Sequence, residues 1–150
     1  FGLLCAVTGA ECAPLLQGTA SVIDGDTIEI HGERIRLDAI DAPESSQLCL
    51  DAAGKRYRCG QKSAFALADM IGRSTVACEP KGRDRYRRII AVCFKGEINL
   101  NGWMVAQGWA VAFRKYGIDY IGQEDEARLA RRGIWAGSFE MPWDWRARNR

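Results

Sequence analysis

The chain has 150 residues, of which 47% are hydrophobic and 27% are charged. This length suits one domain with a single core, and the composition excludes a disordered protein. The apolar runs in the sequence are too short for a membrane-spanning helix. A net charge of +2 is too small to indicate nucleic-acid binding by itself.

The N-terminal segment admits two interpretations. Residues 1–18 are expected to form an arm in front of a single domain at 19–150. The stretch 1–10 is apolar and rich in small residues, which is also typical of the end of a signal peptide. Both interpretations agree with export of the protein, and the sequence does not separate them.

The segment 19–40 predicts an antiparallel meander. Its β-prone stretches are 19–23, 27–30 and 35–37, and its turn sequences are Asp24-Gly25-Asp26 and His31-Gly32-Glu33. Pro43 is expected to end this sheet. A long polar loop at 44–59 then connects the sheet to the rest of the domain.

A helix is expected at 60–71, because its apolar residues fall on one face and Gly72 follows as a C-cap. The further expected elements are strands at 75–78 and 89–94, a short helix from Asn99 to Gly108, a strand at 109–113 and a charged helix at 122–132. This order predicts an α+β fold, and a five-stranded Greek-key barrel is compatible with it. Periodicity alone does not separate such a barrel from other small α+β folds.

The tail at 134–150 contains Trp135, Trp143 and Trp145. These side chains are expected to pack against the domain rather than to stack on bases. The tail also ends in one of three basic clusters, which lie at 55–58, 81–88 and 146–150. Such clusters are interpreted first as solvated surface rather than as phosphate-binding tracks.

Six cysteines in so short a chain indicate disulfides and an oxidising compartment. The sequence has no C-x-x-C pair, and its single histidine, His31, does not complete a zinc site. Of the 15 possible connectivities, we expect Cys5–Cys12, Cys49–Cys59 and Cys78–Cys93. The second bridge would close the polar loop, and the third would join two strands that pair across the charged loop.

Five side chains have the chemistry of a phosphoryl-transfer site. Asp26 and Asp41 stand at the ends of neighbouring strands, and their hard oxygen donors suit Ca²⁺ or Mg²⁺ rather than zinc or copper. Glu44 follows Pro43 closely and could hold a water molecule near such a metal. Arg36 and Arg88 offer forked cations that match a phosphate group.

In their order and spacing, three segments resemble the staphylococcal nuclease family. They are Ile-Asp-Gly-Asp-Thr at 23–27, Arg-Leu-x-x-Ile-Asp-Ala-Pro-Glu at 36–44 and Asp-Arg-Tyr-x-Arg at 84–88. Further matches lie at Asn99, at 105–110 and at 133–135. The resemblance extends from about residue 19 to residue 135, and it is the combination of motifs that is specific.

The resemblance implies an OB-fold, a five-stranded Greek-key barrel with three α-helices. It also implies a calcium-dependent endonuclease that hydrolyses DNA and RNA to 3′-phosphate products. The site residues that it implies are Asp26, Asp41 and the Ala42 carbonyl as Ca²⁺ ligands, Glu44 as general base or water-orienting group, and Arg36 and Arg88 as the clamp on the scissile phosphate. Arg85 and Tyr86 would contact another phosphate, and Phe113 or Tyr116 would lie beside the nucleotide.

Two positions depart from the family pattern. Arg87 replaces the usual glycine, in a turn that a side chain would resist. The substitution also leaves two candidates for the catalytic arginine, and counting from Asp84 favours Arg88, with Ala91 and Cys93 on the opposite, core-facing side. Phe113 replaces a tyrosine, which removes a hydroxyl group and keeps the stacking surface.

The sequence is therefore compatible with three functions. The first is an active nuclease, secreted or periplasmic in a bacterial envelope, acting as a monomer on DNA and RNA. The second is a catalytically weak OB-fold module that binds nucleic acid, and Arg87 motivates it. The third is a structural or envelope role with an unrelated ligand, and the retained pair of like-charged carboxylates argues against it.

Overall fold

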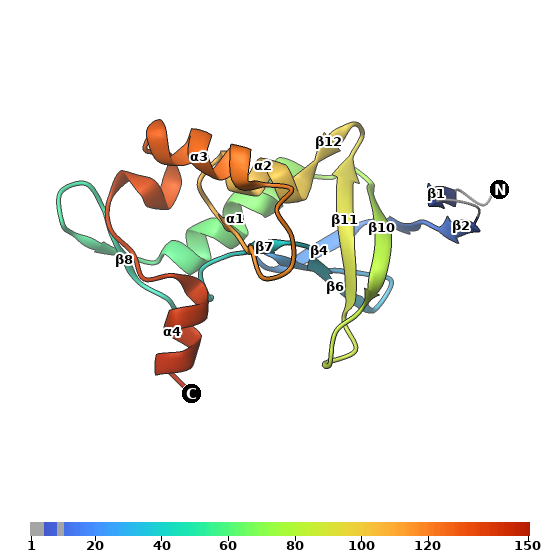
Figure 1. Cartoon of the computed structure of the whole chain (residues 1–150), viewed down its shortest axis with the longest axis horizontal. Helices are drawn as coiled ribbons and strands as arrows, with labels where there is room; N and C mark the ends of the chain where they lie inside the picture. The colour runs from blue at the N-terminus through green and yellow to red at the C-terminus, as the bar shows by residue number, and fades with distance from the viewer. Residues whose placement is uncertain (1–4, 9–10) are drawn as a thin grey trace.

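The computed structural model describes residues 5–8 and 11–150, and their side chains from residue 15 onward. Strands β1 (Cys5–Thr8) and β2 (Glu11–Pro14) pair antiparallel. This pair lies at the edge of the molecule, to the right in Figure 1. Part of the predicted arm thus has regular backbone structure. The status of the segment as arm or signal peptide remains a prediction.

The main sheet contains seven strands, in the order β3-β10-β11-β6-β5-β4 with β12 paired to β11. The strands are β3 (Leu16–Gly18), β4 (Ala20–Asp24), β5 (Thr27–Ile30), β6 (Glu33–Leu37), β10 (Val76–Arg83), β11 (Ile89–Lys95) and β12 (Ile98–Asn99). The predicted antiparallel meander is confirmed in β4, β5 and β6. Strand β11 pairs with β6 in parallel, so its residues lie beside those of the meander.

The α+β class is confirmed, but the sheet has seven strands where five were expected. Its first and last strands, β3 and β4, follow each other in the chain with only Thr19 between them. Among the strands that the structure describes, no paired partners close the sheet into a barrel. Two further pairs join β7 (Ile40–Asp41) to β13 (Val111–Ala112) and β8 (Cys49–Leu50) to β9 (Arg56–Tyr57).

The described part of the chain has four α-helices, one more than expected. They are α1 (Cys59–Ile71), α2 (Leu100–Ala106), α3 (Ile121–Leu129) and α4 (Pro142–Arg148), and a short 3-10 helix lies at Gly133–Ala136. The extra helix is α4, which forms from the tail. Figure 1 shows it below the other helices, at the end of the chain. None of the described helices is long and apolar enough to cross a membrane.

Local signals explain the ends of the predicted helices. The side chain of Asn99 accepts a hydrogen bond from the backbone of Gly102 and so caps α2. Gly72 has a positive φ of 56° after α1 and donates its N–H to the carbonyl of Ala68. Both caps lie where the sequence indicates them.

Two apolar clusters stabilise the domain. In the larger one, buried residues of β5 and β6, such as Ile28 and Ile35, pack with Leu67 of α1 and Met104 of α2. The smaller cluster surrounds the Cys49–Cys59 disulfide, and Trp135 and Trp143 pack against it. Two of the three tail tryptophans therefore pack on the domain, as the sequence analysis expects.

Two predicted disulfides are confirmed. Cys49 and Cys59 are joined with their Cα atoms 5.6 Å apart, and Cys78 and Cys93 with their Cα atoms 4.0 Å apart. Cys78 and Cys93 are also direct partners in the ladder between β10 and β11. The predicted Cys5–Cys12 bridge involves side chains outside the described residues.

Candidate active site

Asp26 and Asp41 lie together at one end of the meander. Asp26 follows the end of β4 in a tight turn, and Asp41 ends β7. Their residues are 7% and 0% exposed. Asp26 Oδ2 accepts a hydrogen bond of 2.8 Å from the N–H of Ala42, the residue after Asp41. This bond ties the two carboxylate-bearing segments to each other.

A glycine allows this turn to approach the first helix closely. A Cβ atom on Gly25 would overlap the hydroxyl group of Ser63, on the buried face of α1. Ser63 cannot readily move away, because its hydroxyl donates a hydrogen bond of 2.6 Å to the carbonyl of Trp109. The Asp-Gly-Asp sequence thus places Asp26 against the core as well as reversing the chain.

Arg36 of β6 lies between the two carboxylates, and its side chain is 15% exposed. Its Nη2 atom is 3.5 Å from Asp26 Oδ2 and 3.4 Å from Asp41 Oδ1. Its Nη1 atom donates to the carbonyl of Leu37 over 2.8 Å, which fixes the guanidinium group. Buried carboxylates of like sign repel each other, and one largely buried cation offsets that repulsion.

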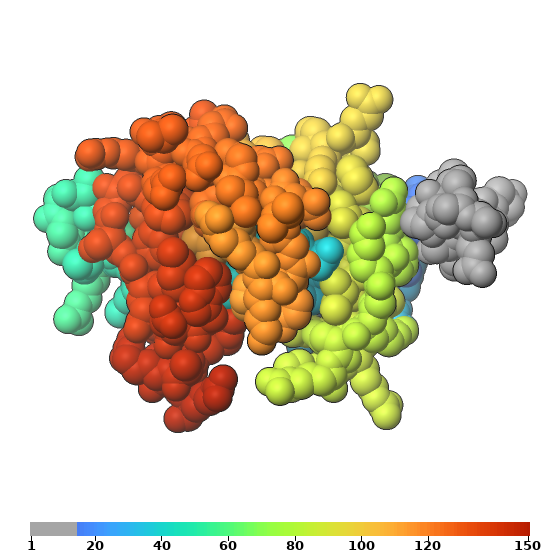
Figure 2. All heavy atoms as spheres, in the orientation of Figure 1, coloured from blue at the N-terminus to red at the C-terminus, as the bar shows by residue number. Residues whose placement is uncertain are grey.

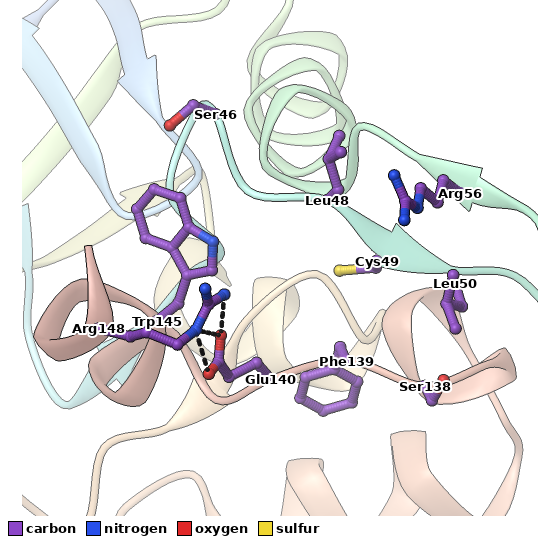
Figure 3. A pocket seen from close by; sticks show the side chains of 10 residues that line it. All are labelled: Ser46, Leu48, Cys49, Leu50, Arg56, Ser138, Phe139, Glu140, Trp145 and Arg148. Atoms are coloured by element: carbon purple, nitrogen blue, oxygen red, sulfur yellow. Dashed lines mark hydrogen bonds and ion pairs between the residues drawn. The ribbon is translucent and has the colours of Figure 1, made fainter.

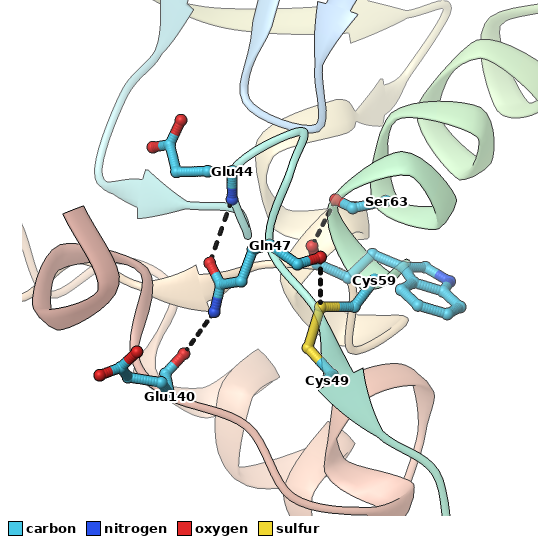
Figure 4. Close-up of a disulfide and its surroundings, with 7 residues drawn as sticks. Glu44, Gln47, Cys49, Cys59, Ser63 and Glu140 are labelled. Atoms are coloured by element: carbon cyan, nitrogen blue, oxygen red, sulfur yellow. Dashed lines mark hydrogen bonds between the residues drawn. A yellow bond between two sulfur atoms is a disulfide. The ribbon is translucent and has the colours of Figure 1, made fainter. Parts of the chain in front are cut away.

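Glu44 lies on the loop that follows Pro43, and Figure 4 shows how this loop is anchored. The backbone N–H of Glu44 donates to the side-chain oxygen of Gln47, which is fully buried. The amide nitrogen of Gln47 donates in turn to the carbonyl of Glu140 over 2.8 Å. The Cys49–Cys59 disulfide lies beside this chain of bonds. Glu44 is therefore held by a cross-linked loop although its side chain is partly exposed.

Arg146 of α4 is a site residue that the sequence analysis missed. Its two terminal nitrogens donate to the two carboxylate oxygens of Asp41, each over 2.8 Å. Its Nη1 atom also donates to Glu44 Oε1 over 2.8 Å. The basic cluster at 146–150 is interpreted from sequence as solvated surface, and this arginine corrects that interpretation. No local signal distinguishes it from the other arginines of the tail.

Asp24 is a second residue that was missed, because Asp-Gly-Asp is an ordinary turn sequence. Burial, reinforced by repulsion from Asp26 and Glu44, raises the pKa of Asp24 to about 6, against the opposing attraction of Arg36 and Arg88. Burial likewise raises the pKa of Asp41 to about 6, although Arg146 and Arg36 act to lower it. Burial, more than the neighbouring charges, thus disfavours the charged forms of Asp24 and Asp41.

Arg88 precedes β11 and is oriented by Asp84. Its Nε atom donates to Asp84 Oδ2 over 2.7 Å, and its backbone N–H donates to Asp84 Oδ1 over 2.9 Å. In the parallel pairing of β11 with β6, Ile90 is the partner of Arg36. Side chains two residues apart share a face of a strand, and the charges of Arg36 and Arg88 both act on Asp24, so we infer that Arg88 faces the same side as Arg36. The buried residues Ala91 and Cys93 lie on the other face.

Arg87 adopts a left-handed backbone conformation, with a φ of 65°. Glycine is the residue that takes this conformation without steric cost. Arg87 therefore replaces the usual glycine at a position where the backbone conformation favours glycine. The turn still forms around Asp84, whose carbonyl accepts a hydrogen bond from the N–H of Arg87.

The remaining predicted residues form two groups on the surface. Tyr86 is 64% exposed, and the guanidinium groups of Arg85 and Arg88 lie 4.9 Å and 5.5 Å from its ring centre. Phe113 contacts the ring of Tyr116, with centroids 4.9 Å apart, and the ring of Trp143, with centroids 5.1 Å apart. Trp143 is an aromatic neighbour that the sequence analysis did not assign to the site.

The donors at this site fit a hard cation. Asp26, Asp41 and the Ala42 carbonyl offer oxygen atoms, which are the ligands that Ca²⁺ prefers. Asp41 and Glu44 already hold a cation, the guanidinium group of Arg146. Within the residues that the structure describes, no group of three or more His, Cys, Asp and Glu side chains could hold a metal ion alone. A bound Ca²⁺ would thus need carbonyl, water or substrate oxygens as well.

Comparison with known proteins identifies the family. The family model described as staphylococcal nuclease homologue matches residues 34–137. The succinoglycan biosynthesis protein ExoI of Rhizobium meliloti (strain 1021) is 44% identical over 135 residues, which cover 87% of this chain and 70% of the relative. A micrococcal nuclease of Shigella flexneri is 37% identical over 143 residues, which cover 83% and 76%.

A protein of Haemophilus influenzae named as an uncharacterized endonuclease is 35% identical over 133 residues, which cover 83% of this chain and 69% of the relative. The matched region contains Arg36, Asp41, Glu44 and Arg88 and ends before α4. The chain belongs to the staphylococcal nuclease homologue family.

Proposed function

We propose that this protein is a calcium-dependent endonuclease that hydrolyses phosphodiester bonds in DNA and RNA and leaves 3′-phosphate ends. The observation that carries this proposal is the position of Arg36, within 3.5 Å of both Asp26 and Asp41. Buried carboxylates around a guanidinium group, with Glu44 nearby, suit a site that binds a cation and a phosphate together. Membership of a nuclease family supports the same conclusion.

Each residue has a separate task in the proposed reaction. Asp26, Asp41 and the Ala42 carbonyl would hold Ca²⁺, which when bound offsets negative charge on the scissile phosphate. Glu44 orients the attacking water and accepts its proton. Arg36 and Arg88 donate to the phosphate oxygens and stabilise the charge that develops on them. The bond between phosphorus and the 5′ oxygen breaks, which leaves the phosphate on the 3′ side.

The surface groups would bind the rest of the substrate. Arg85 and Tyr86 lie on the turn that carries Arg88 and can contact a neighbouring phosphate. Phe113 and Tyr116 form an edge-to-face pair, and their rings offer a stacking surface for a base. Nucleic acid is accordingly the proposed partner, and the protein is proposed to act as a monomer.

The two disulfides favour an oxidising compartment, and we extend this to a secreted or periplasmic location. The finer fold proposal is a closed OB-fold barrel. The end strands β3 and β4 are consecutive in the chain, so one bent strand could complete the sheet on both sides. Amide hydrogen exchange tests this, because edge strands of an open sheet would lose protection first.

The alternative function is a module that binds nucleic acid without cleaving it. The left-handed conformation of Arg87 favours this alternative, because strain beside Arg88 could misplace the phosphate clamp. Digestion of single-stranded DNA, plasmid DNA and RNA with Ca²⁺ and with chelator separates the two functions. Cleavage that needs Ca²⁺ and is lost in Asp41→Asn supports the nuclease. A shift of single-stranded DNA without cleavage at any Ca²⁺ concentration supports the binding module.

A further inference from the structure

The carboxylate of Asp41 is paired with a cation from the same chain, the guanidinium group of Arg146. Arg146 engages both carboxylate oxygens of Asp41 and one oxygen of Glu44, all over 2.8 Å. The Asp41 side chain is 0% exposed, while the Arg146 side chain is 35% exposed. The fork of the guanidinium thus reaches a buried carboxylate from the outer side of the site. Bidentate bonds of this kind are among the strongest that a carboxylate makes.

A second side chain on the same face of α4 covers the neighbouring surface. Trp143 precedes Arg146 by three residues, so the two side chains lie on one face of the helix. The Trp143 ring lies 5.1 Å from the ring of Phe113, at an interplanar angle of 30°. In Figure 2 the red surface of the C-terminal segment adjoins an orange surface of the preceding part of the chain. One helix face therefore occupies both the carboxylate site and an aromatic ring of the proposed nucleotide surface.

The other side of α4 contacts the side chain of Glu140, whose backbone carbonyl holds Gln47. Arg148 forms hydrogen bonds with Glu140, the shortest of them 2.8 Å long. Figure 3 shows this pair in a pocket that Trp145 also lines. Arg146 and Arg148 are thus two ion-paired arginines on one short helix, and only Arg146 contacts the site. They form a matched pair for experiment.

Arg146 and a metal ion would bind the same carboxylate group, that of Asp41. Both are cations, and both need the oxygens of this carboxylate. A Ca²⁺ ion bound to the same carboxylate would lie close to the guanidinium group, and two positive charges that close in a partly buried site repel each other strongly. Helix α4 has only seven residues, and a helix of this length has little stability apart from its contacts. Displacement of α4 must therefore overcome these contacts, among them the packing of Trp143 against the smaller apolar cluster.

We propose that Arg146 is an internal cation that competes with Ca²⁺ for Asp41 and Glu44, so that metal binding displaces the Trp143–Arg146 face of α4. Displacement frees Glu44 for water and uncovers Phe113 for a nucleotide. Arg146 thereby sets the metal affinity of the site, because only the fraction of molecules with α4 displaced can bind. The inference rests on the proposed calcium site.

The first test measures Ca²⁺ binding by titration calorimetry without nucleic acid. Arg146→Gln should bind Ca²⁺ about tenfold more tightly than wild type, because the competing cation is removed. Arg146→Lys keeps the positive charge but loses the forked guanidinium group, so its affinity for Ca²⁺ should lie between those of wild type and Arg146→Gln. Arg148→Gln removes an equal charge from the same helix and should bind within about twofold of wild type.

The second test separates displacement of the helix from a simple change of charge. The indole N–H signal of Trp143 can be followed by NMR and assigned with Trp143→Phe. Ca²⁺ should shift this signal in wild type. In metal-free Arg146→Gln the signal should already lie toward its calcium-bound position, because both changes release the same face of α4.

Several results would overturn the inference. Equal or weaker Ca²⁺ binding in Arg146→Gln would show that Arg146 does not compete with the metal. Tighter binding with an unmoved Trp143 signal would show an effect of charge without displacement. Either result leaves the proposed calcium site intact. Absence of Ca²⁺ binding in both wild type and Arg146→Gln would overturn the calcium site and the competition together.

Discussion

Arg146 donates to both carboxylate oxygens of Asp41 over 2.8 Å, although 105 positions separate the two residues in the sequence. The contact brings the end of the chain onto the end of β7, next to Glu44. It joins a helix outside the matched family region to residues inside it. The candidate site is therefore a product of the whole fold and not of the meander alone.

Replacement of Arg36 should remove most of the activity. Arg36→Lys puts a point charge where a forked donor spans Asp26 and Asp41. We expect the cleavage rate at saturating substrate to fall by about 10²–10³, the usual effect of losing a group that stabilises developing charge. Arg34→Lys is the control, because the Arg34 side chain is 62% exposed. Similar rates for the two variants would contradict the role of Arg36.

Replacement of Arg87 by glycine should stabilise the protein. The φ of 65° at Arg87 costs a residue with a side chain about 1 kcal/mol, and the extra freedom of glycine in the unfolded chain offsets part of the gain. The free energy of unfolding by urea should rise by up to about 1 kcal/mol. Arg85→Gly, at a position of the same loop without a positive φ, should lower it. A lower stability for Arg87→Gly would show that the turn carries no strain.

The sequence was informative wherever a structural signal is local. Turn residues located the meander, Asn99 and Gly72 located helix ends, and ladder geometry paired Cys78 with Cys93. Spacing and motif order also indicated Asp26, Arg36 and Asp41 as site residues. In the fold, Arg36 lies within ion-pair distance of both carboxylates, and Asp26 accepts a hydrogen bond from the residue after Asp41.

The features that were missed depend on tertiary contacts. Helix α4 has a proline in its first turn and basic residues in its last turn, which are helix signals. Its seven residues are too few for a clear periodicity, however, and its tryptophans and arginines have no local partner. The raised pKa of Asp24 arises from burial and from charges on other segments, so no spacing in the sequence reveals it.

Asp24 should make the metal-free protein less stable at neutral pH than in acid. Its pKa is about 6 in the folded chain and near 3.8 when unfolded, so the folded state binds the proton more tightly. This group therefore lowers stability progressively as the pH rises from about 4 to above 6, and its cost is absent below that range.

Asp24→Asn removes this cost, because asparagine carries no charge. In chelator at pH 8 the variant should unfold at a higher urea concentration, with a gain on the order of 1 kcal/mol after allowance for solvent screening. At pH 4 the difference from wild type should be much smaller. Asp125→Asn on α3 serves as the control. A gain for Asp24→Asn that is the same at both pH values would contradict the role of its charge.

The Cys49–Cys59 disulfide should matter for the site as well as for stability. Its removal by the double change to alanine frees a loop with a sequence separation of 10 and should cost about 2–3 kcal/mol of unfolding free energy. Gln47, two residues before Cys49, orients the backbone of Glu44 and accepts a hydrogen bond from the N–H of Gly60, next to Cys59. Cleavage at a temperature where the variant remains folded should therefore slow.

The matching change at Cys78 and Cys93 provides the comparison. This bridge joins the paired strands β10 and β11 at a sequence separation of 15, and neither of its cysteines belongs to the loop that carries Glu44. Its loss should reduce stability by a similar amount, about 3 kcal/mol, with a smaller effect on cleavage by the folded protein. Equal effects of the two changes on cleavage would show that the Cys49–Cys59 loop does not position Glu44.

The role of Glu44 is tested by the cleavage rate of a labelled single-stranded DNA by wild type, Glu44→Gln and Glu126→Gln at saturating Ca²⁺. Glu126 also pairs with an arginine but lies on α3, with its side chain 56% exposed. We predict that Glu44→Gln slows cleavage by about 10²–10⁴, the range for a general base, while Glu126→Gln matches wild type. Equal rates for wild type and Glu44→Gln would contradict the proposed site.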